Sequence, residues 1–222
     1  MEAKQEYLAS LSRGSISHQS PPNILLILLD DLGYGDLGVT GSRAIATPNL
    51  DALAEQGVRL SNFYSPAPVC TPARAGILTG RLPLRAGMPE VVFPTGHPIS
   101  YALKIADVPS RIPAEEITLA DILSAVGYDT GMVGKWHLGD RSPSLPNDMG
   151  FASYFGALYS NDMTPFALYR NDQVEVEAPA DHVAVHDGHE SVDSVWITPA
   201  AAVAEAEAGR RSIIFPTLQN VK

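Results

Sequence analysis

The chain has 222 residues, of which 45% are hydrophobic and 18% are charged, a composition typical of a globular protein with a core of its own. Its formal net charge of −10, with no basic stripe, argues against a nucleic-acid partner. No apolar run approaches the ~20 residues that span a bilayer, and a single cysteine excludes any framework of intrachain disulfides.

Residues 1–22 are mostly polar and end in Pro21-Pro22, so we expect a flexible lead-in before a domain that occupies residues 23–222. The lead-in has basic residues but no continuous apolar stretch, so it lacks the pattern of a secretory signal peptide. The single cysteine does not indicate a redox compartment. The localisation of the protein therefore stays open.

The run Asn23–Leu29 is almost entirely apolar and has the length of a strand, which predicts a central strand buried on both faces. It stops at Asp30 and Asp31. Ligands of α/β sheets bind beyond the carboxyl ends of the strands, and carboxylates are preferred ligands of Ca²⁺ and Mg²⁺. The pair is a candidate metal site, with a solvated pair of aspartates as the alternative.

The loop Gly33–Gly38 matches the G-x-G-x-x-G pattern of dinucleotide-binding proteins directly after this strand. Residues 39–43, however, lack the apolar period of the helix that this motif requires. Asp30, Asp31 and Asp36 would also crowd a pyrophosphate with negative charge. We therefore reject a dinucleotide site.

Residues 48–56 have the pattern of a helix, with Thr47 as its cap, proline in its first turn and Gly57 as its end. Residues 58–64 predict a strand, which gives the alternation of an α/β protein. The expected buried face of the helix consists of Leu50, Leu53 and Ala54.

The only cysteine, Cys70, opens the stretch Cys-Thr-Pro-Ala-Arg-Ala-Gly-Ile-Leu-Thr-Gly-Arg. Pro72 suits the first turn of a helix and Gly80 the position just past its end. Cys70 would then lie at the positive end of a helix dipole, with Arg74 one turn away, an arrangement suited to an anionic substrate. The alternative is a buried structural cysteine.

Residues 82–113 are rich in Pro and Gly and predict a loop region at the rim of the site, in which His97 is an ordinary surface histidine. Thr118 then caps a helix that extends to Val126, followed by a strand over residues 128–133.

The segment Gly-Lys-Trp-His-Leu-Gly follows this strand at residues 134–139. In an extended chain Lys135 and His137 project to one side and Trp136 to the other.

These motifs resemble a known family. Residues 70–81 resemble the signature of the type I sulfatases, in the alkaline phosphatase superfamily, and residues 134–139 resemble their second signature. Residues 22–38 resemble the family's first strand and loop. Residues 155–163 resemble a segment of the arylsulfatase A branch, in which Ser160 corresponds to a serine near the nucleophile.

The resemblance implies an α/β fold with a large mixed central β-sheet flanked by helices and the site at the carboxyl ends of strands. It is strongest over residues 21–177, and residues 210–222 are atypical. A family member would continue into a second half with an Asp-Asn metal pair, a second histidine and a second lysine. The chain is therefore interpreted as the N-terminal part of a sulfatase catalytic domain.

The implied function is that of a sulfuric ester hydrolase. In the family, a formylglycine-generating enzyme oxidises the signature cysteine, and the hydrate of the formylglycine attacks the sulfur of a sulfate ester. A Ca²⁺ or Mg²⁺ ion assists. The roles implied here are catalytic for Cys70, Arg74, Lys135 and His137, substrate-binding for Lys135, His137 and Ser160, and metal-binding for Asp30, Asp31 and Cys70.

Two alternatives stay open. A phosphoesterase of the same superfamily would carry Thr or Ser in place of Cys70, and a truncated chain would be catalytically inactive. We expect no measurable sulfatase activity from the 222 residues alone. Family members are commonly exported or lysosomal, and the substrate stays open among aryl, lipid and sugar sulfates.

Two features near the end of the chain complete the pattern. Residues 168–171 fit a structural strand of the arylsulfatase A branch, and residues 198–209 predict a last helix. Between them, an acidic stretch is interpreted as a solvated loop, with a metal site as the alternative, because it contains His182, His186 and His189.

Overall fold

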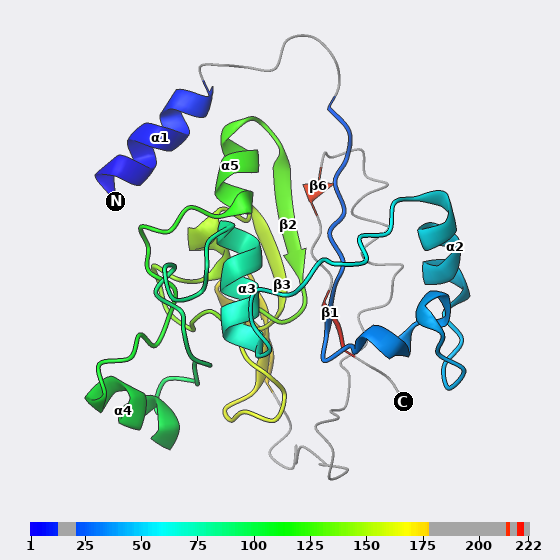
Figure 1. The fold of residues 1–222 in the computed structure, drawn as a ribbon. Helices are drawn as coiled ribbons and strands as arrows, with labels where there is room; N and C mark the ends of the chain where they lie inside the picture. The colour runs from blue at the N-terminus through cyan, green and yellow to red at the C-terminus, as the bar shows by residue number, and fades with distance from the viewer. Residues whose placement is uncertain (13–20, 178–211, 214–216, 220–222) are drawn as a thin grey trace.

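A computed structural model describes residues 1–12, 21–177, 212–213 and 217–219 of the chain (Figure 1). Its helices are α1 (Glu2–Ser12), α2 (Pro48–Gln56), α3 (Cys70–Thr79), α4 (Pro98–Ile105) and α5 (Leu119–Ala125). Its strands are β1 (Leu28–Asp30), β2 (Asp129–Val133), β3 (Ser153–Ala157), β4 (Ala167–Arg170), β5 (Gln173–Glu177), β6 (Ser212–Ile213) and β7 (Thr217–Gln219). Short 3₁₀ turns are η1 (Tyr34–Asp36), η2 (Gly38–Thr40) and η3 (Pro146–Met149).

The larger sheet has the strand order β5-β4-β3-β2-β6. Strand β2 runs parallel to β3 and β6, whereas β3, β4 and β5 are successively antiparallel. Strand β1 pairs in parallel with β7 in a separate two-stranded sheet. Helices α3 and α5 lie beside β2 and β3 (Figure 1). This mixed sheet with flanking helices confirms the predicted fold class.

The hydrophobic core lies around the segment that follows β2. Trp136 is fully buried, meets the ring of Phe151 edge-on at 6.2 Å between centroids, and donates its indole N–H to the carbonyl oxygen of Ser144 at 2.9 Å. Burying this large side chain fixes the backbone between Lys135 and His137. The other fully buried large side chains include Met88, Ile112, Leu138, Met149 and Tyr154.

Local capping patterns set the start of α5 and the end of α3 as predicted. The Thr118 hydroxyl accepts the N–H of Asp121 at 3.0 Å, and the Asp121 carboxylate accepts the N–H of Thr118 at 2.9 Å, which is the reciprocal cap expected for α5. Helix α3 ends at Gly80, whose φ of 66° lies in the left-handed region that glycine adopts readily. The predicted helix over residues 48–56 is confirmed as α2, but the Thr47 side chain does not cap it and instead donates its hydroxyl hydrogen to the Asp51 carboxylate at 3.0 Å.

The lead-in contains a helix that the sequence pattern did not predict. Lys4 of α1 is buried, and its ammonium group lies 2.8 Å from the Asp121 carboxylate and donates to the carbonyl oxygen of Glu116 at 2.8 Å. Because Asp121 also caps α5, this buried ion pair fastens α1 to the start of α5 (Figure 1). Residues 2–12 thus form a helix that packs against α5.

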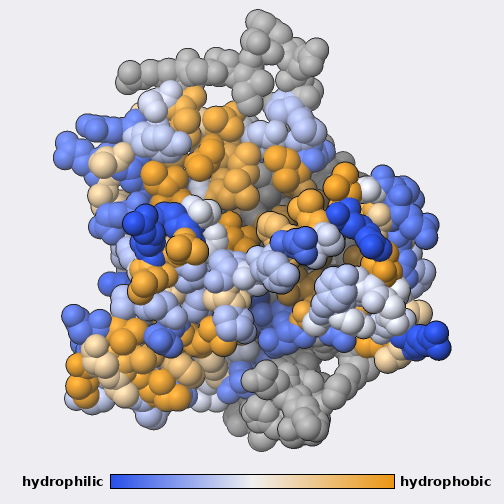
Figure 2. All heavy atoms as spheres, in the orientation of Figure 1, coloured by the Kyte–Doolittle hydropathy of each residue, from blue (hydrophilic) through white to orange (hydrophobic). Residues whose placement is uncertain are grey.

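The prediction of a strand buried on both faces is wrong for the first apolar run. Only Leu28–Asp30 forms a strand, and within the described residues it pairs on one side only, with β7. Ile24, Leu25 and Ile27 are exposed, and apolar side chains lie on the visible face near β1 (Figure 2). Periodicity detects an apolar strand, but burial depends on what covers its faces.

Two neighbouring predictions also fail. Residues 58–64 form no strand in the structure, and Val58 in this segment is 87% exposed. Leu53, which we expected on the buried face of α2, is 63% exposed. A strand needs a neighbour to accept its backbone hydrogen bonds, and no described segment pairs with residues 58–64.

Helix α4 lies inside the segment predicted as loop. Pro98 occupies its first turn, and the ring nitrogen Nδ1 of His97 accepts the N–H of Ile99 at 3.2 Å. The His97 ring also stacks on Phe93, with 5.1 Å between centroids. His97 is therefore a helix cap and not merely a surface histidine. The sequence did not predict this role, because the residues usually found at a cap are Ser, Thr, Asp, Asn and Gly.

The remaining strand predictions are confirmed by β2 and β4. His182, His186, His189 and the helix predicted over residues 198–209 lie outside the described residues. Among the helices that are described, none combines the length and the apolar character needed to cross a bilayer.

Candidate active site

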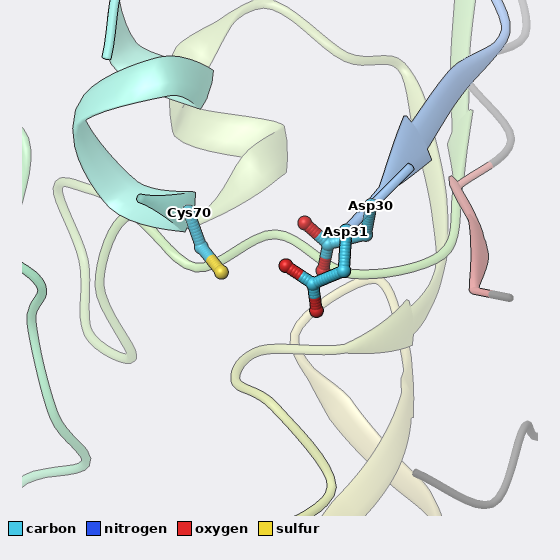
Figure 3. Close-up of side chains that lie close together, drawn as sticks. All are labelled: Asp30, Asp31 and Cys70. Carbon is cyan, nitrogen blue, oxygen red and sulfur yellow. The ribbon is translucent and has the colours of Figure 1, made fainter. Parts of the chain in front are cut away.

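Strand β1 and helix α3 bring three side chains together (Figure 3). Asp30 ends β1, Asp31 follows with a left-handed φ of 54°, and Cys70 is the first residue of α3. One ligand atom from each of the three lies within 4.8 Å of the others. Asp30 is buried, Cys70 half-buried and Asp31 exposed, so the cluster opens to solvent on the side of Asp31.

Lys135 joins this cluster from the segment after β2. Its ammonium group donates to the Asp30 carboxylate at 2.7 Å, to Ser160 Oγ at 3.1 Å and to Cys70 Sγ at 3.2 Å. The side chain is buried, so little solvent screens its charge. One cation therefore links the end of β1, the start of α3 and the loop after β3.

Arg74 lies one helical turn beyond Cys70 and is also buried. Its guanidinium donates to the carbonyl oxygen of Lys135 at 2.5 Å and lies 3.4 Å from the Asp30 carboxylate. Burial alone would raise the pKa of Asp30, but the charges of Arg74 and Lys135 outweigh it and lower that pKa to about 2. Asp30 is therefore ionised at neutral pH.

The Cys70 thiol is not activated as a nucleophile. Burial raises its pKa above the ordinary value, although Lys135 opposes the shift. The thiolate is the reactive form of cysteine, so the protonated thiol beside Lys135 is a weak nucleophile.

His137 lies beside the cluster in an unusual backbone conformation, with φ of 59°. Its Nε2 lies 3.0 Å from the carbonyl oxygen of Val92, and its own carbonyl accepts the Thr71 hydroxyl at 2.9 Å. Burial lowers the pKa of His137 to about 3, and the charges of Lys135 and Arg74 act in the same direction. The imidazole is thus neutral at neutral pH.

The structure brings Asp30, Asp31, Cys70, Arg74, Lys135 and Ser160 into one cluster, with His137 adjacent to it through Thr71. Three neighbours were not singled out from the sequence. Thr71 and Val92 bond His137, and Tyr159 packs its ring edge-on against the imidazole at 5.6 Å. Thr71 lies inside the cysteine motif, so the motif could have drawn attention to it. No pattern in the sequence around Val92 indicates a role for that residue.

The donor set fits a hard divalent cation. Two adjacent carboxylates supply the oxygen ligands that Ca²⁺ and Mg²⁺ prefer. A full shell of 6–8 oxygens for Ca²⁺ needs more ligands than these residues provide. Asp30 also pairs with Lys135 and Arg74, so a cation there would share this carboxylate with both side chains.

The fold is that of an α/β protein, and at the end of β1 two carboxylates, two basic side chains and a cysteine lie together. A family model described as Sulfatase matches residues 22–220, and the chain belongs to the sulfatase family. This membership confirms the resemblance carried by the sequence motifs.

The chain is similar to several named sulfatases. It is 46% identical over 168 residues to arylsulfatase A of Homo sapiens, and the matched region covers 74% of this chain and 31% of that protein. It is 44% identical over 144 residues to N-acetylgalactosamine-6-sulfatase of Homo sapiens, covering 65% of this chain and 27% of the relative. The chain therefore spans about a third or less of the length of these relatives.

Solved structures show the same fold. The structure of Ps i-CgsB in complex with k-i-k-neocarrahexaose superposes with a TM-score of 0.68 at 26% identity, covering 91% of this chain and 45% of that one. PsFucS1 sulfatase from Pseudoalteromonas sp. gives 0.63 at 28% identity, covering 96% and 47%.

Proposed function

We propose that the protein hydrolyses a sulfate ester, with residue 70 converted to formylglycine by a formylglycine-generating enzyme. The observation that carries the proposal is the placement of Lys135, whose ammonium group contacts residue 70, Asp30 and Ser160 at once. A buried cation at the start of a helix is suited to hold a sulfate against the group that attacks it. Sulfatase family membership supports this choice of anion.

Residue 70 supplies the nucleophile in this proposal. In the hydrated form of formylglycine it carries the hydroxyl that attacks sulfur, whereas the unmodified thiol is held protonated by burial. Lys135, 3.2 Å from Sγ, would stabilise negative charge at that position. Arg74 would hold Lys135 and Asp30 in place through its contacts with both.

We propose that Asp30 and Asp31, with residue 70, hold a Ca²⁺ or Mg²⁺ ion. When bound, such an ion neutralises charge on sulfate oxygens and favours the deprotonated nucleophile. Asp30 is suited to the role because Arg74 and Lys135 keep it ionised. Asp31 adds a second, more exposed carboxylate beside it.

His137 and Ser160 complete the site. His137 is neutral and can accept a proton at one ring nitrogen, which would assist the release of sulfate. Ser160 already binds Lys135 and could donate its hydroxyl hydrogen to a sulfate oxygen. We further propose that residues 23–222 are the N-terminal part of a sulfatase catalytic domain and that residues 1–22 precede it.

The test uses the longest natural form of the protein, coexpressed with a formylglycine-generating enzyme. Peptide mass spectrometry over residues 65–81 should show conversion of Cys70 to the aldehyde, and p-nitrophenyl sulfate should be hydrolysed faster than p-nitrophenyl phosphate. The Cys70→Ala variant is the control and should lose sulfatase activity. Faster phosphate hydrolysis would favour the phosphoesterase alternative, and full sulfatase activity in Cys70→Ala would refute the proposed nucleophile.

A further inference from the structure

Three buried residues form a closed ring of hydrogen bonds beside the candidate site. The Thr71 hydroxyl donates to the carbonyl oxygen of His137 at 2.9 Å, and the N–H of Val92 donates to Thr71 Oγ1 at 3.2 Å. His137 Nε2 lies 3.0 Å from the carbonyl oxygen of Val92 and closes the ring. The ring joins α3 to two loops that are distant from it in sequence.

The ring determines which nitrogen of His137 carries the proton. A carbonyl oxygen can only accept, so the bond to Val92 requires the hydrogen on Nε2. The imidazole is neutral, because burial and then Lys135 and Arg74 lower its pKa to about 3. A neutral imidazole has one N–H, so Nδ1 is left as an acceptor.

Nδ1 of His137 is buried and has no hydrogen-bond partner among the described residues. Buried polar atoms nearly always have a partner, and an exception calls for a functional explanation. A ring nitrogen kept as a proton acceptor, in an imidazole that interacts with the charges of Lys135 and Arg74, is such an explanation. The edge-on contact with Tyr159 also restricts the ring plane.

The backbone of His137 also depends on the ring. Its φ of 59° is uncommon for a residue with a side chain and persists only where the surroundings enforce it. The His137 N–H donates to the carbonyl oxygen of Leu158 at 2.9 Å, and the Thr71 hydroxyl holds the His137 carbonyl. Thr71 thus binds His137 directly at the backbone and indirectly at the ring, through Val92.

We propose that Thr71 is a positioning residue whose hydroxyl holds His137 in the Nε2–H tautomer, leaving Nδ1 as the proton acceptor of the site. The part that concerns catalysis rests on the proposed sulfate ester hydrolysis. Serine at position 71 would keep the hydroxyl. Valine would keep the shape of threonine but would break both of its hydrogen bonds.

The test is long-range ¹H–¹⁵N correlation NMR on the chain labelled with ¹⁵N-histidine, with the His137 signals assigned by their loss in His137→Gln. At pH 7 the chain and Thr71→Ser should both show the Nε2–H pattern. Thr71→Val should show mixed tautomers or exchange of the Nε2 proton at least about tenfold faster. An unchanged pattern and exchange rate in Thr71→Val would overturn the proposal. So would an Nδ1–H pattern in the unsubstituted chain, an outcome that does not depend on whether the variant folds.

Kinetics on the longest natural form provide the second readout. Thr71→Val should lower kcat at least about tenfold with little change in KM, and Thr71→Ser should retain most of the activity. Equal kcat in Thr71→Val and the unsubstituted protein would overturn the role in catalysis. If the unsubstituted protein hydrolyses no sulfate ester, the proposed function fails, while the NMR result still decides whether Thr71 sets the tautomer.

Discussion

Lowering the pH should destabilise the folded chain through His137. This side chain is 1% exposed, and burial, with Lys135 and Arg74, lowers its pKa from 6.5 to about 3. The unfolded chain binds a proton near pH 6.5, whereas the folded chain does not. The stability contributed by the neutral ring is therefore fully present above pH 6.5 and is lost progressively as the pH falls toward 3.

The magnitude at pH 5 follows from the same values. Each pH unit in this window costs about 1.36 kcal/mol, and pH 5 lies about 1.5 units below the unfolded-state pKa, so the loss is about 2 kcal/mol. Because the folded-state pKa lies well below 5, this figure depends mainly on the ordinary pKa of histidine.

Urea unfolding at pH 7 and pH 5, followed by circular dichroism, measures this loss. The pH-dependent change in unfolding free energy should be about 2 kcal/mol smaller in His137→Gln than in the unsubstituted chain. Glutamine can still donate to the carbonyl oxygen of Val92. His97→Gln is the matched control for replacing a histidine by glutamine elsewhere in the chain. If His137→Gln shows the same pH dependence as the unsubstituted chain, the buried neutral histidine is not the cause.

Three further predictions concern the site and its frame. Asp31→Asn should weaken the binding of Ca²⁺ or Mg²⁺ at least about tenfold in isothermal titration of the longest natural form. Asparagine keeps the size of the side chain and adopts the left-handed φ of 54° found at this position. Equal affinity would mean that the aspartate pair is only solvated. Arg74→Met should lower the free energy of unfolding by about 2–3 kcal/mol, because Asp30 loses one of its two charged partners among the described residues and keeps Lys135. An unchanged urea midpoint would contradict this. Gly156→Ala should lower the free energy of unfolding by at least about 1–3 kcal/mol, since the added Cβ would lie 2.0 Å from the main-chain oxygen of Gly134. Gly35→Ala is the control and should leave the stability unchanged, because nothing lies within 4 Å of its added Cβ. Equal stability of the two variants would show that the backbone shifts to accommodate the methyl group at position 156.

The sequence alone determined the elements whose signals are local. A cap, a first-turn proline and a terminal glycine lie within a few residues of the helix that they limit, so α2, α3 and α5 were predicted close to their observed bounds. The same holds for the spacing of Cys70 and Arg74, because one helical turn places both on one side of α3. The motifs at residues 70–81 and 134–139 were sufficient to indicate the family that the family model confirms.

Tertiary structure alone decided how distant segments meet. The Lys135 ammonium group contacts Asp30 across 105 residues of sequence, and the buried ion pair of Lys4 with Asp121 links α1 to α5, a contact that no periodicity predicts. Burial of the first apolar run was mispredicted because it depends on neighbours that the run itself does not specify. The tautomer of His137 is set by the carbonyl oxygen of Val92, a backbone atom that every residue has. A sequence motif can identify side chains with a chemical role, but a hydrogen bond to a particular main-chain oxygen exists only once the chain has folded.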